Sequence, residues 1–286
     1  MFNVVIFSKD RACQLHALLE SWGRFCQGTI PSVLFVASDP EFLAGYHLLA
    51  RRIHDSASVA AAKLFQQAHF RQDVFNLIGN ANPFTMFMVD DMLVRRPIVF
   101  DAELVRPLVN DPSVVSVSLR LSPSITYSYA TDQQSSPPVF DVVASSDASG
   151  QVLTWRWPGC VGDWGYVFST DACIYRTSDL MQVLARNPWF SPNTLEATAV
   201  RDPLWLARPK MACRGEHAVM NIPANLVQRD YLTNRTCGGA GAEALNQTYL
   251  SGNVIELAPL VALPTSSCHV DAPYSYRRHE RNHTNG

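Results

Sequence analysis

The stretch that decides the fold runs from Thr85 to Val94 and reads TMFMVDDMLV. Five uncharged residues lead directly into Asp90 and Asp91, and a second apolar run follows them. An apolar run of this length without Gly or Pro predicts a buried strand, although a buried helical segment has the same pattern. Carboxylates rarely lie in a core unless they are paired or bind a metal. The pair therefore indicates a functional site at the carboxyl end of a strand, and the alternative is a solvated acidic turn.

Upstream of this stretch, strand-like and helical segments alternate. The predicted strands cover residues 3–8, 32–37 and 53–56, and the predicted helices cover residues 13–25, 41–52 and 58–73. Residues 85–89 are then a fourth strand. This β-α-β-α order predicts an α/β fold with a mainly parallel central sheet flanked by helices.

Polar residues follow the first two predicted strands where each strand ends. Ser8 ends the first strand and Arg11 follows it, and Asp39 follows the second strand. Because open α/β sheets bind ligands at the carboxyl ends of their strands, Ser8 and Arg11 are placed to meet a phosphate or a base. The alternative is that Ser8 or Asp10 only caps the following helix. Carboxylates such as the acidic pair suit Mg²⁺ or Mn²⁺, which would in turn hold a diphosphate.

The second half of the chain is less regular. Residues 114–121 alternate as a strand, 122–150 predict a long loop or lid, and 222–228 predict a short edge strand. Glu196 lies where a new helix opens, so it either supports the helix start or acts as a catalytic base facing an acceptor hydroxyl. His269 lies near the end of the chain, where a histidine is usually exposed and without a function.

Composition and charge exclude several classes of protein. The 286 residues are 47% hydrophobic, so they can form a large core, and a net charge of −2 offers no basic field for nucleic acid. No apolar run is long enough for a membrane span, and the chain opens without a signal-like segment, so we expect a cytoplasmic protein. The seven cysteines are scattered without a Cys-x-x-Cys pair, which predicts reduced thiols and no zinc site.

Four segments, taken in order, resemble those of glycosyltransferases with the GT-A (Rossmann-like) fold, and in particular the family-2-like and exostosin-like nucleotide-sugar transferases. Residues 6–11, with Gln14-Leu15 after them, are similar to the family's nucleotide-binding first turn, and residues 87–91 to its metal-binding "DxD" strand end. Residues 193–196 resemble the acidic motif that opens the acceptor-side helix, and Cys268-His269 resembles the late histidine that completes the metal site.

The resemblance implies one GT-A domain with a nucleotide-sugar-binding half at 1–121, a smaller acceptor-side half at 122–274 and a flexible tail at 275–286. It also implies an enzyme that moves a sugar from a nucleotide-diphosphate sugar donor to a hydroxyl of a glycan or polysaccharide, with inversion and with help from Mn²⁺ or Mg²⁺. The partners are then the sugar donor and the glycan acceptor.

Specific roles follow from the same resemblance. Asp91 and His269 would hold the metal, and Glu196 would be the catalytic base, with Asp163 as the next choice. The nucleotide sugar would be bound by Ser8, Arg11, Asp39, Lys63 and Asp90.

Two departures from the family pattern keep other functions open. Met92 occupies a position where the family commonly has a third Asp, and Leu195 precedes Glu196 where two successive acids are common. A non-catalytic binding protein on a degenerate transferase fold is therefore one alternative. A sugar nucleotidyltransferase is another, although the chain lacks that class's Gly-rich, basic signature after the first strand. Walker, Gly-x-Ser-x-Gly and Gly-x-Gly-x-x-Gly motifs are also missing from the sequence.

Overall fold

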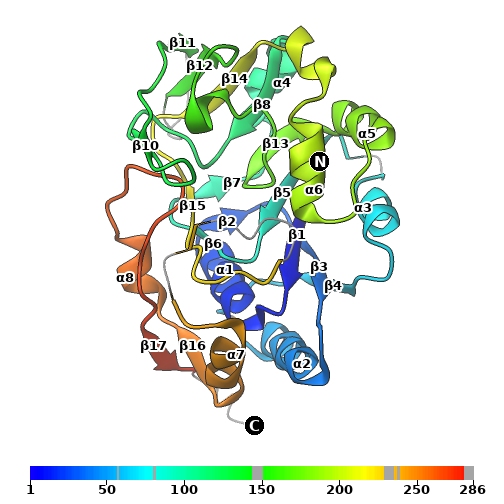
Figure 1. Ribbon diagram of the computed structural model, residues 1–286, viewed down its shortest axis with the longest axis vertical. Helices are drawn as coiled ribbons and strands as arrows, with labels where there is room; N and C mark the ends of the chain where they lie inside the picture. Colours follow the sequence, from blue (N-terminus) through cyan, green and yellow to red (C-terminus); the bar gives the residue numbers. More distant parts are fainter. Residues whose placement is uncertain (57, 80–81, 144–150, 229–234, 237–238, 280–286) are drawn as a thin grey trace.

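A nine-stranded sheet forms the centre of the computed structural model, which describes residues 1–56, 58–79, 82–143, 151–228, 235–236 and 239–279 (Figure 1). The strands lie in the order β11-β12-β14-β8-β13-β5-β1-β3-β4. Their bounds are β1 Phe2–Lys9, β3 Ser32–Val36, β4 Lys63–Gln66, β5 Phe84–Val89, β8 Val114–Ser118, β11 Asp141–Val143, β12 Val152–Arg156, β13 Cys173–Arg176 and β14 Lys210–Arg214.

The predicted α/β class with flanking helices is confirmed, and the sheet is mixed. The four strands β5, β1, β3 and β4 run parallel, as the order of the N-terminal elements predicts. Beyond β5 the sheet is largely antiparallel. Strand β13 is antiparallel to both β5 and β8, and β12 is antiparallel to β11 and β14. The mainly parallel arrangement therefore holds only for the half formed by the N-terminal strands.

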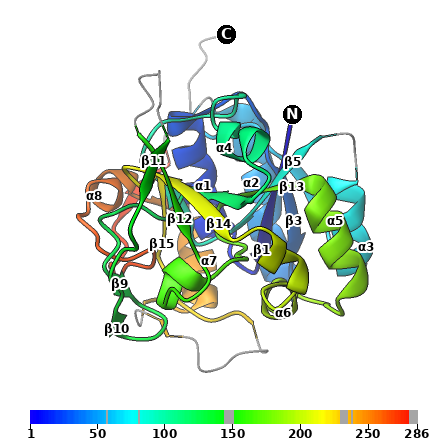
Figure 2. The same cartoon turned by 90° about the horizontal axis from the view of Figure 1, so that it is seen from above.

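Helices cover both faces of the sheet (Figure 2). Successive side chains of a strand point to opposite faces, so each strand contributes to two apolar cores. In β1, Val4 and Ile6 join one apolar core while Val5 and Phe7 join the other. The first core is covered by α1 Ala12–Phe25, α2 Pro40–Asp55, α4 Arg106–Asn110, α7 Ala242–Leu250 and α8 Leu257–Val261. The second is covered by α3 Phe70–Ile78, α5 Thr177–Arg186 and α6 Pro192–Ala199.

Four two-stranded pairs lie outside the main sheet. They are β2 Cys26–Gln27 with β7 Ile98–Val99, β6 Met92–Val94 with β15 Val219–Asn221, β9 Tyr127–Ser128 with β10 Gln133–Gln134, and β16 Asn253–Ile255 with β17 Tyr276–Arg278. Two 3₁₀ helices cover Gly162–Gly165 and Pro203–Ala207. Strand β17 belongs to the segment predicted to be a flexible tail, of which residues 280–286 lie outside the described residues.

Four predicted elements differ from the structure. The loop or lid predicted at 122–150 contains β9, β10 and β11, of which β11 belongs to the main sheet, and residues 144–150 lie outside the described residues. Residues 53–55 continue α2 instead of forming a strand, and the helix predicted at 58–73 is replaced by β4 and the start of α3. Strand β4 is an edge strand with only β3 as a neighbour and is largely exposed, so its sequence lacks the apolar pattern of a buried strand. Residues 222–228 form no strand, and the pairing predicted there belongs to β15 just before them.

Within the described ranges, no helix is both long and apolar enough to cross a membrane.

Candidate active site

The acidic pair lies at the carboxyl edge of the parallel strands. Strand β5 ends at Val89, opposite Phe7 of β1, so the turn at Asp90 and Asp91 meets the residues that follow β1. Asp90 is 3% exposed and accepts a hydrogen bond from the backbone N–H of Lys9 at 3.0 Å. The end of β1 is therefore hydrogen-bonded to the turn that follows β5, and this bond fixes the position of Asp90.

Arg11 joins the two carboxylates. Its Nη1 lies 3.0 Å from Asp90 Oδ1 and 3.1 Å from Asp91 Oδ2. The other side of the guanidinium is held by Asn225, since Nε donates to its Oδ1 at 2.9 Å and Nη2 donates to its backbone oxygen. Arg11 is the residue before the first turn of α1, so the β1–α1 connection carries the cation directly to the acids.

Burial and neighbouring charges act in opposite directions on the pKa values of Asp90 and Arg11. Burial raises the pKa of Asp90 from 3.8 to about 6, because desolvation and the neighbouring Asp91 outweigh the favourable charge of Arg11. Burial works against the charge of Arg11, but the two carboxylates hold the pKa of its guanidinium above its ordinary value. Arg11 is therefore permanently charged, whereas Asp90 takes up a proton in mildly acidic solution.

Other residues predicted for nucleotide-sugar binding lie at different distances from this pair. Ser8 is at the site, where its hydroxyl is 2.7 Å from that of Tyr46 and also bonds to Asp90. Asp39 caps α2 by accepting from the N–H groups of residues 41 and 42. Lys63 is exposed at the amino end of β4, where it is paired with Ser32, so the structure does not bring it to the carboxyl edge.

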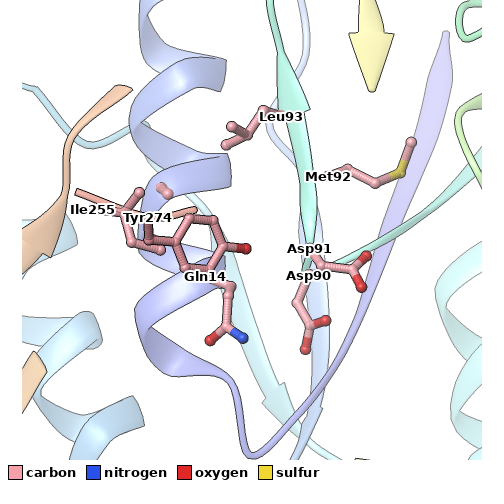
Figure 3. A pocket seen from close by; sticks show the side chains of 8 residues that line it. Gln14, Asp90, Asp91, Met92, Leu93, Ile255 and Tyr274 are labelled. Carbon is pink, nitrogen blue, oxygen red and sulfur yellow. The ribbon is translucent and has the colours of Figure 1, made fainter. Parts of the chain in front are cut away.

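A narrow crevice, too small to admit a water molecule, borders the acidic pair. It is lined by Gln14, Ala17, Asp90, Asp91, Met92, Leu93, Ile255 and Tyr274. Figure 3 shows Gln14 on α1 beside Asp90, with Met92 and Leu93 continuing into β6. Gln14 is 2% exposed, and neither its amide nitrogen nor its amide oxygen has a hydrogen-bond partner within the described residues. Met92 is fully buried in the core and supplies no polar atom to the site.

A second acidic cluster lies at the same edge and includes Asp171, which the sequence analysis did not identify. Nε2 of His269 is 3.6 Å from Asp171 Oδ2. Burial opposes both charges, yet each partner favours the charged form of the other: the pKa of Asp171 is lowered and that of His269 is raised. Because β13 runs antiparallel to β5, its preceding residues, and with them Asp171, reach the edge where β5 ends.

Glu196 belongs to this second cluster. Its Oε2 accepts hydrogen bonds from the backbone N–H and the hydroxyl of Thr170, at 2.6 and 2.7 Å. Burial, followed by the charge of Asp171, raises the pKa of its carboxyl group. Glu196 is the fifth residue of α6, and the helix start is capped instead by Ser191 with Thr194. Helix capping therefore does not account for this acid.

Asn221 connects the two clusters. Its Nδ2 lies 3.4 Å from Asp91 Oδ1, and its side chain also bonds to Asp171. The backbone of Asn221 pairs with the segment around His269: its N–H donates to the carbonyl oxygen of Cys268 at 2.9 Å, and its carbonyl oxygen accepts from the N–H of Val270 at 2.8 Å. β15 thereby brings a C-terminal histidine beside strands from the first third of the chain.

Asp163, the second choice for a base, is engaged elsewhere. Its Oδ1 accepts from Arg120 Nη1 at 2.8 Å, and Arg120 is 2% exposed. The positive charge of Arg120 also favours the charged forms of Asp171 and Glu196, although burial and the charge of Asp171 leave the pKa of Glu196 raised. Asp163 is thus a partner for a buried cation.

The residues around the acidic pair do not fit a divalent ion. Mg²⁺ and Mn²⁺ require several oxygen ligands in near-octahedral geometry, with distances of about 2.1 Å for Mg²⁺. In the part of the chain that the structure describes, no group of three or more His, Cys, Asp or Glu residues is arranged to hold a metal ion. Arg11 instead contacts one oxygen of each carboxylate. The structure therefore does not assemble the metal site expected from Asp91 and His269.

No protein-family model and no curated protein matches the chain. In fold the chain is similar to GT-A glycosyltransferases, at low sequence identity. S. aureus TarS 1–349 in complex with UDP is 12% identical with a TM-score of 0.43, and the match covers 76% of this chain and 59% of that one. The mannosyltransferase PcManGT from Pyrobaculum calidifontis, in complex with GDP-Man and Mn²⁺, is 11% identical with a TM-score of 0.35, covering 74% and 56%. A longer S. aureus TarS structure is 13% identical with a TM-score of 0.43, and the match spans 36% of its length.

Proposed function

We propose that the chain is a glycosyltransferase that moves a sugar from a nucleotide-diphosphate sugar to a hydroxyl group of a glycan or polysaccharide. The observation that carries this proposal is the meeting of two acidic clusters at one sheet edge, joined through the side chain of Asn221. Transfer between two substrates needs one group of residues for the donor and a base for the acceptor, held side by side.

The first cluster is assigned to the donor. Ser8 lies near the carboxyl end of β1, and Arg11, Asp90 and Asp91 follow the ends of β1 and β5. Open α/β sheets bind nucleotides at this edge. Arg11 supplies a fixed positive charge, and the carboxylates supply acceptors for the hydroxyl groups of a ribose or a sugar. The unpartnered amide of Gln14 offers a further donor and acceptor next to them.

The second cluster is assigned to the acceptor, with Glu196 as the base. A carboxyl group whose pKa is raised towards the working pH is a better base than an ordinary carboxylate. Glu196 takes the proton from the acceptor hydroxyl while that oxygen forms a bond to the anomeric carbon. The bond from this carbon to the diphosphate breaks, the nucleoside diphosphate leaves with the electron pair, and the configuration is inverted. Asp171 and His269 form a charged pair that positions the acceptor beside Glu196.

The proposal is tested by incubating the chain with nucleotide-sugar donors and a panel of glycan acceptors. We expect one donor class to release nucleoside diphosphate and to increase the mass of the acceptor by one sugar residue. Donor binding without transfer to any acceptor would favour the non-catalytic binding protein instead. Release of pyrophosphate from a nucleoside triphosphate and a sugar phosphate would favour the nucleotidyltransferase.

A further inference from the structure

The acidic pair already has a cation. One nitrogen of Arg11 lies within 3.1 Å of both Asp90 and Asp91, and the two side chains of the closer pair are 9% and 4% exposed. A guanidinium stays protonated under all ordinary conditions, so the positive charge of Arg11 does not depend on pH. One of the two negative charges that would attract a divalent ion is therefore offset from within the chain.

Arg11 is also held in this place from its other side. Asn225 accepts from Nε and Nη2, and the backbone N–H of Arg11 donates to the Tyr46 hydroxyl at 3.3 Å. A metal ion bound to the same carboxylate oxygens would lie within a few ångströms of the guanidinium, where two positive charges repel each other strongly. Metal binding would thus require Arg11 to leave both the carboxylates and Asn225.

Among the residues that the structure describes, no third His, Cys, Asp or Glu joins the pair in a group that could hold a metal ion. The position after Asp91 is Met92, whose side chain is fully buried in the apolar core. The polar groups that border the pair are the neutral amides of Gln14 and Asn221. A neutral donor and acceptor next to compensated carboxylates suits the hydroxyl groups of an organic ligand better than the shell of a hard cation.

We propose that Arg11 takes the place of a divalent metal ion at the Asp90–Asp91 pair, so that the chain binds a nucleoside diphosphate without metal. The part that concerns the nucleoside diphosphate rests on the proposed function. The part that concerns the metal rests only on the geometry of Arg11 and the acids, and it is testable without any nucleotide.

The first experiment measures Mn²⁺ binding to the full chain, by the electron paramagnetic resonance signal of free Mn²⁺. We expect no stoichiometric binding to the wild-type protein. Arg11→Gln removes the resident cation, so its affinity for Mn²⁺ should rise by about tenfold or more. The double variant Arg11→Gln/Asp91→Asn should lose that gain. Arg186→Gln, which breaks an ion pair with Asp202 far from the site, is the matched control and should bind no Mn²⁺.

Arg11→Lys covers the case in which Arg11→Gln fails to fold. It keeps the positive charge, and we expect it to exclude Mn²⁺ as the wild-type protein does. One Mn²⁺ bound per wild-type chain, and lost in Asp91→Asn, would overturn the inference whatever the variants of Arg11 do.

The second experiment measures UDP and GDP binding by calorimetry, with either EDTA or Mn²⁺ present. We expect the same affinity in both conditions for the nucleotide that binds. An affinity at least tenfold higher with Mn²⁺ would contradict metal-independent binding. Binding of neither nucleotide would count against the proposed function, while the Mn²⁺ experiment would still decide whether Arg11 occupies the place of the metal.

Discussion

The two acidic clusters lie at one edge of the sheet but differ in their cationic partners. Asp90 and Asp91 share a permanently charged arginine, whereas Asp171 faces His269, whose charge depends on pH. The pKa of Asp90 is raised by burial, and that of Asp171 is lowered by its histidine. Glu196, with no cation in direct contact, has a raised pKa. The difference teaches that similar carboxyl groups take different roles according to their neighbours: one cluster faces a cation whose charge is permanent, and the other faces a cation whose charge depends on pH.

The largest effect on sugar transfer is expected at Glu196, the proposed base. Glu196→Gln keeps the shape of the side chain but cannot accept the proton, so sugar transfer should fall by about 10²- to 10⁴-fold. Donor affinity, measured by calorimetry, should stay unchanged, because the donor cluster is intact. Glu243→Gln, on the exposed first turn of α7, is the control and should transfer at the wild-type rate. Full activity in Glu196→Gln would move the base to another residue, with Asp171 as the nearest acid.

The next largest effect concerns Arg11, the permanently charged partner of Asp90 and Asp91, and the stability of the fold. Arg11→Gln leaves two buried carboxylates without their cation, so the free energy of unfolding should fall by about 3–5 kcal/mol, as expected for breaking a buried ion pair from one side. Urea unfolding measures this loss. Arg186→Gln, at a more exposed ion pair, should cost much less. Equal losses in the two variants would mean that Arg11 is no more important to the fold than a surface ion pair.

Asp90 and Asp171, one from each cluster, should also make the free energy of unfolding depend on pH in opposite ways. Between about pH 4 and 6, Asp90 keeps its proton in the native protein, whereas the unfolded chain has already lost it. The contribution of Asp90 to stability is therefore fully present below about pH 4 and is lost as the pH rises through about 6. The lowered pKa of Asp171 has the reverse consequence: its contribution is present above the ordinary pKa and is lost as the pH falls. The contribution of His269, whose pKa is raised, is lost as the pH rises through its folded-state value.

Unfolding free energies at a series of pH values test this contrast. The difference between the wild-type protein and Asp90→Asn should shrink or reverse as the pH rises from about 4 to 6, whereas the difference from Asp171→Asn should grow over the acidic range. Parallel slopes in the two variants would show that the clusters do not differ in protonation.

The smallest effect is expected at Lys63. It lies exposed at the amino end of β4, away from both clusters, so Lys63→Ala should change the free energy of unfolding by no more than about 0.5 kcal/mol. Donor affinity should be unchanged in a calorimetric titration. A loss of donor binding would show that the lysine reaches the nucleotide despite its position.

Much of the N-terminal half could be predicted from the sequence. The strand that ends at the acidic pair is a nearly uninterrupted apolar run, and the alternation of strands and helices before it predicts parallel pairing. Ser8 and Arg11 could therefore be placed beside the acids. The edge strand β4 could not be predicted, because its exposed residues do not show the pattern of a buried strand.

The second cluster was harder to predict because it depends on strand direction. Asp171 comes before β13, and in a parallel sheet it would lie at the edge opposite Asp90. Only the antiparallel pairing of β13 with β5 brings it to the site. Asn221 and Asn225 are joined to Asp91 and Arg11 across more than a hundred residues of sequence, and no local pattern predicts such contacts. The ion pair of Arg11 with the acids likewise requires the three-dimensional structure, since the sequence alone favoured a metal there.

The most direct test of the central claim is the thermal unfolding of the wild-type protein with UDP-, GDP-, dTDP- and CMP-linked sugars, each with EDTA or with Mn²⁺. A ligand that binds only the native state raises the Tm by mass action. The account predicts that one nucleoside-diphosphate class raises the Tm, and that EDTA leaves the shift unchanged. No shift with any nucleotide sugar would contradict the proposed function. A shift that appears only with Mn²⁺ would support donor binding but contradict the role assigned to Arg11.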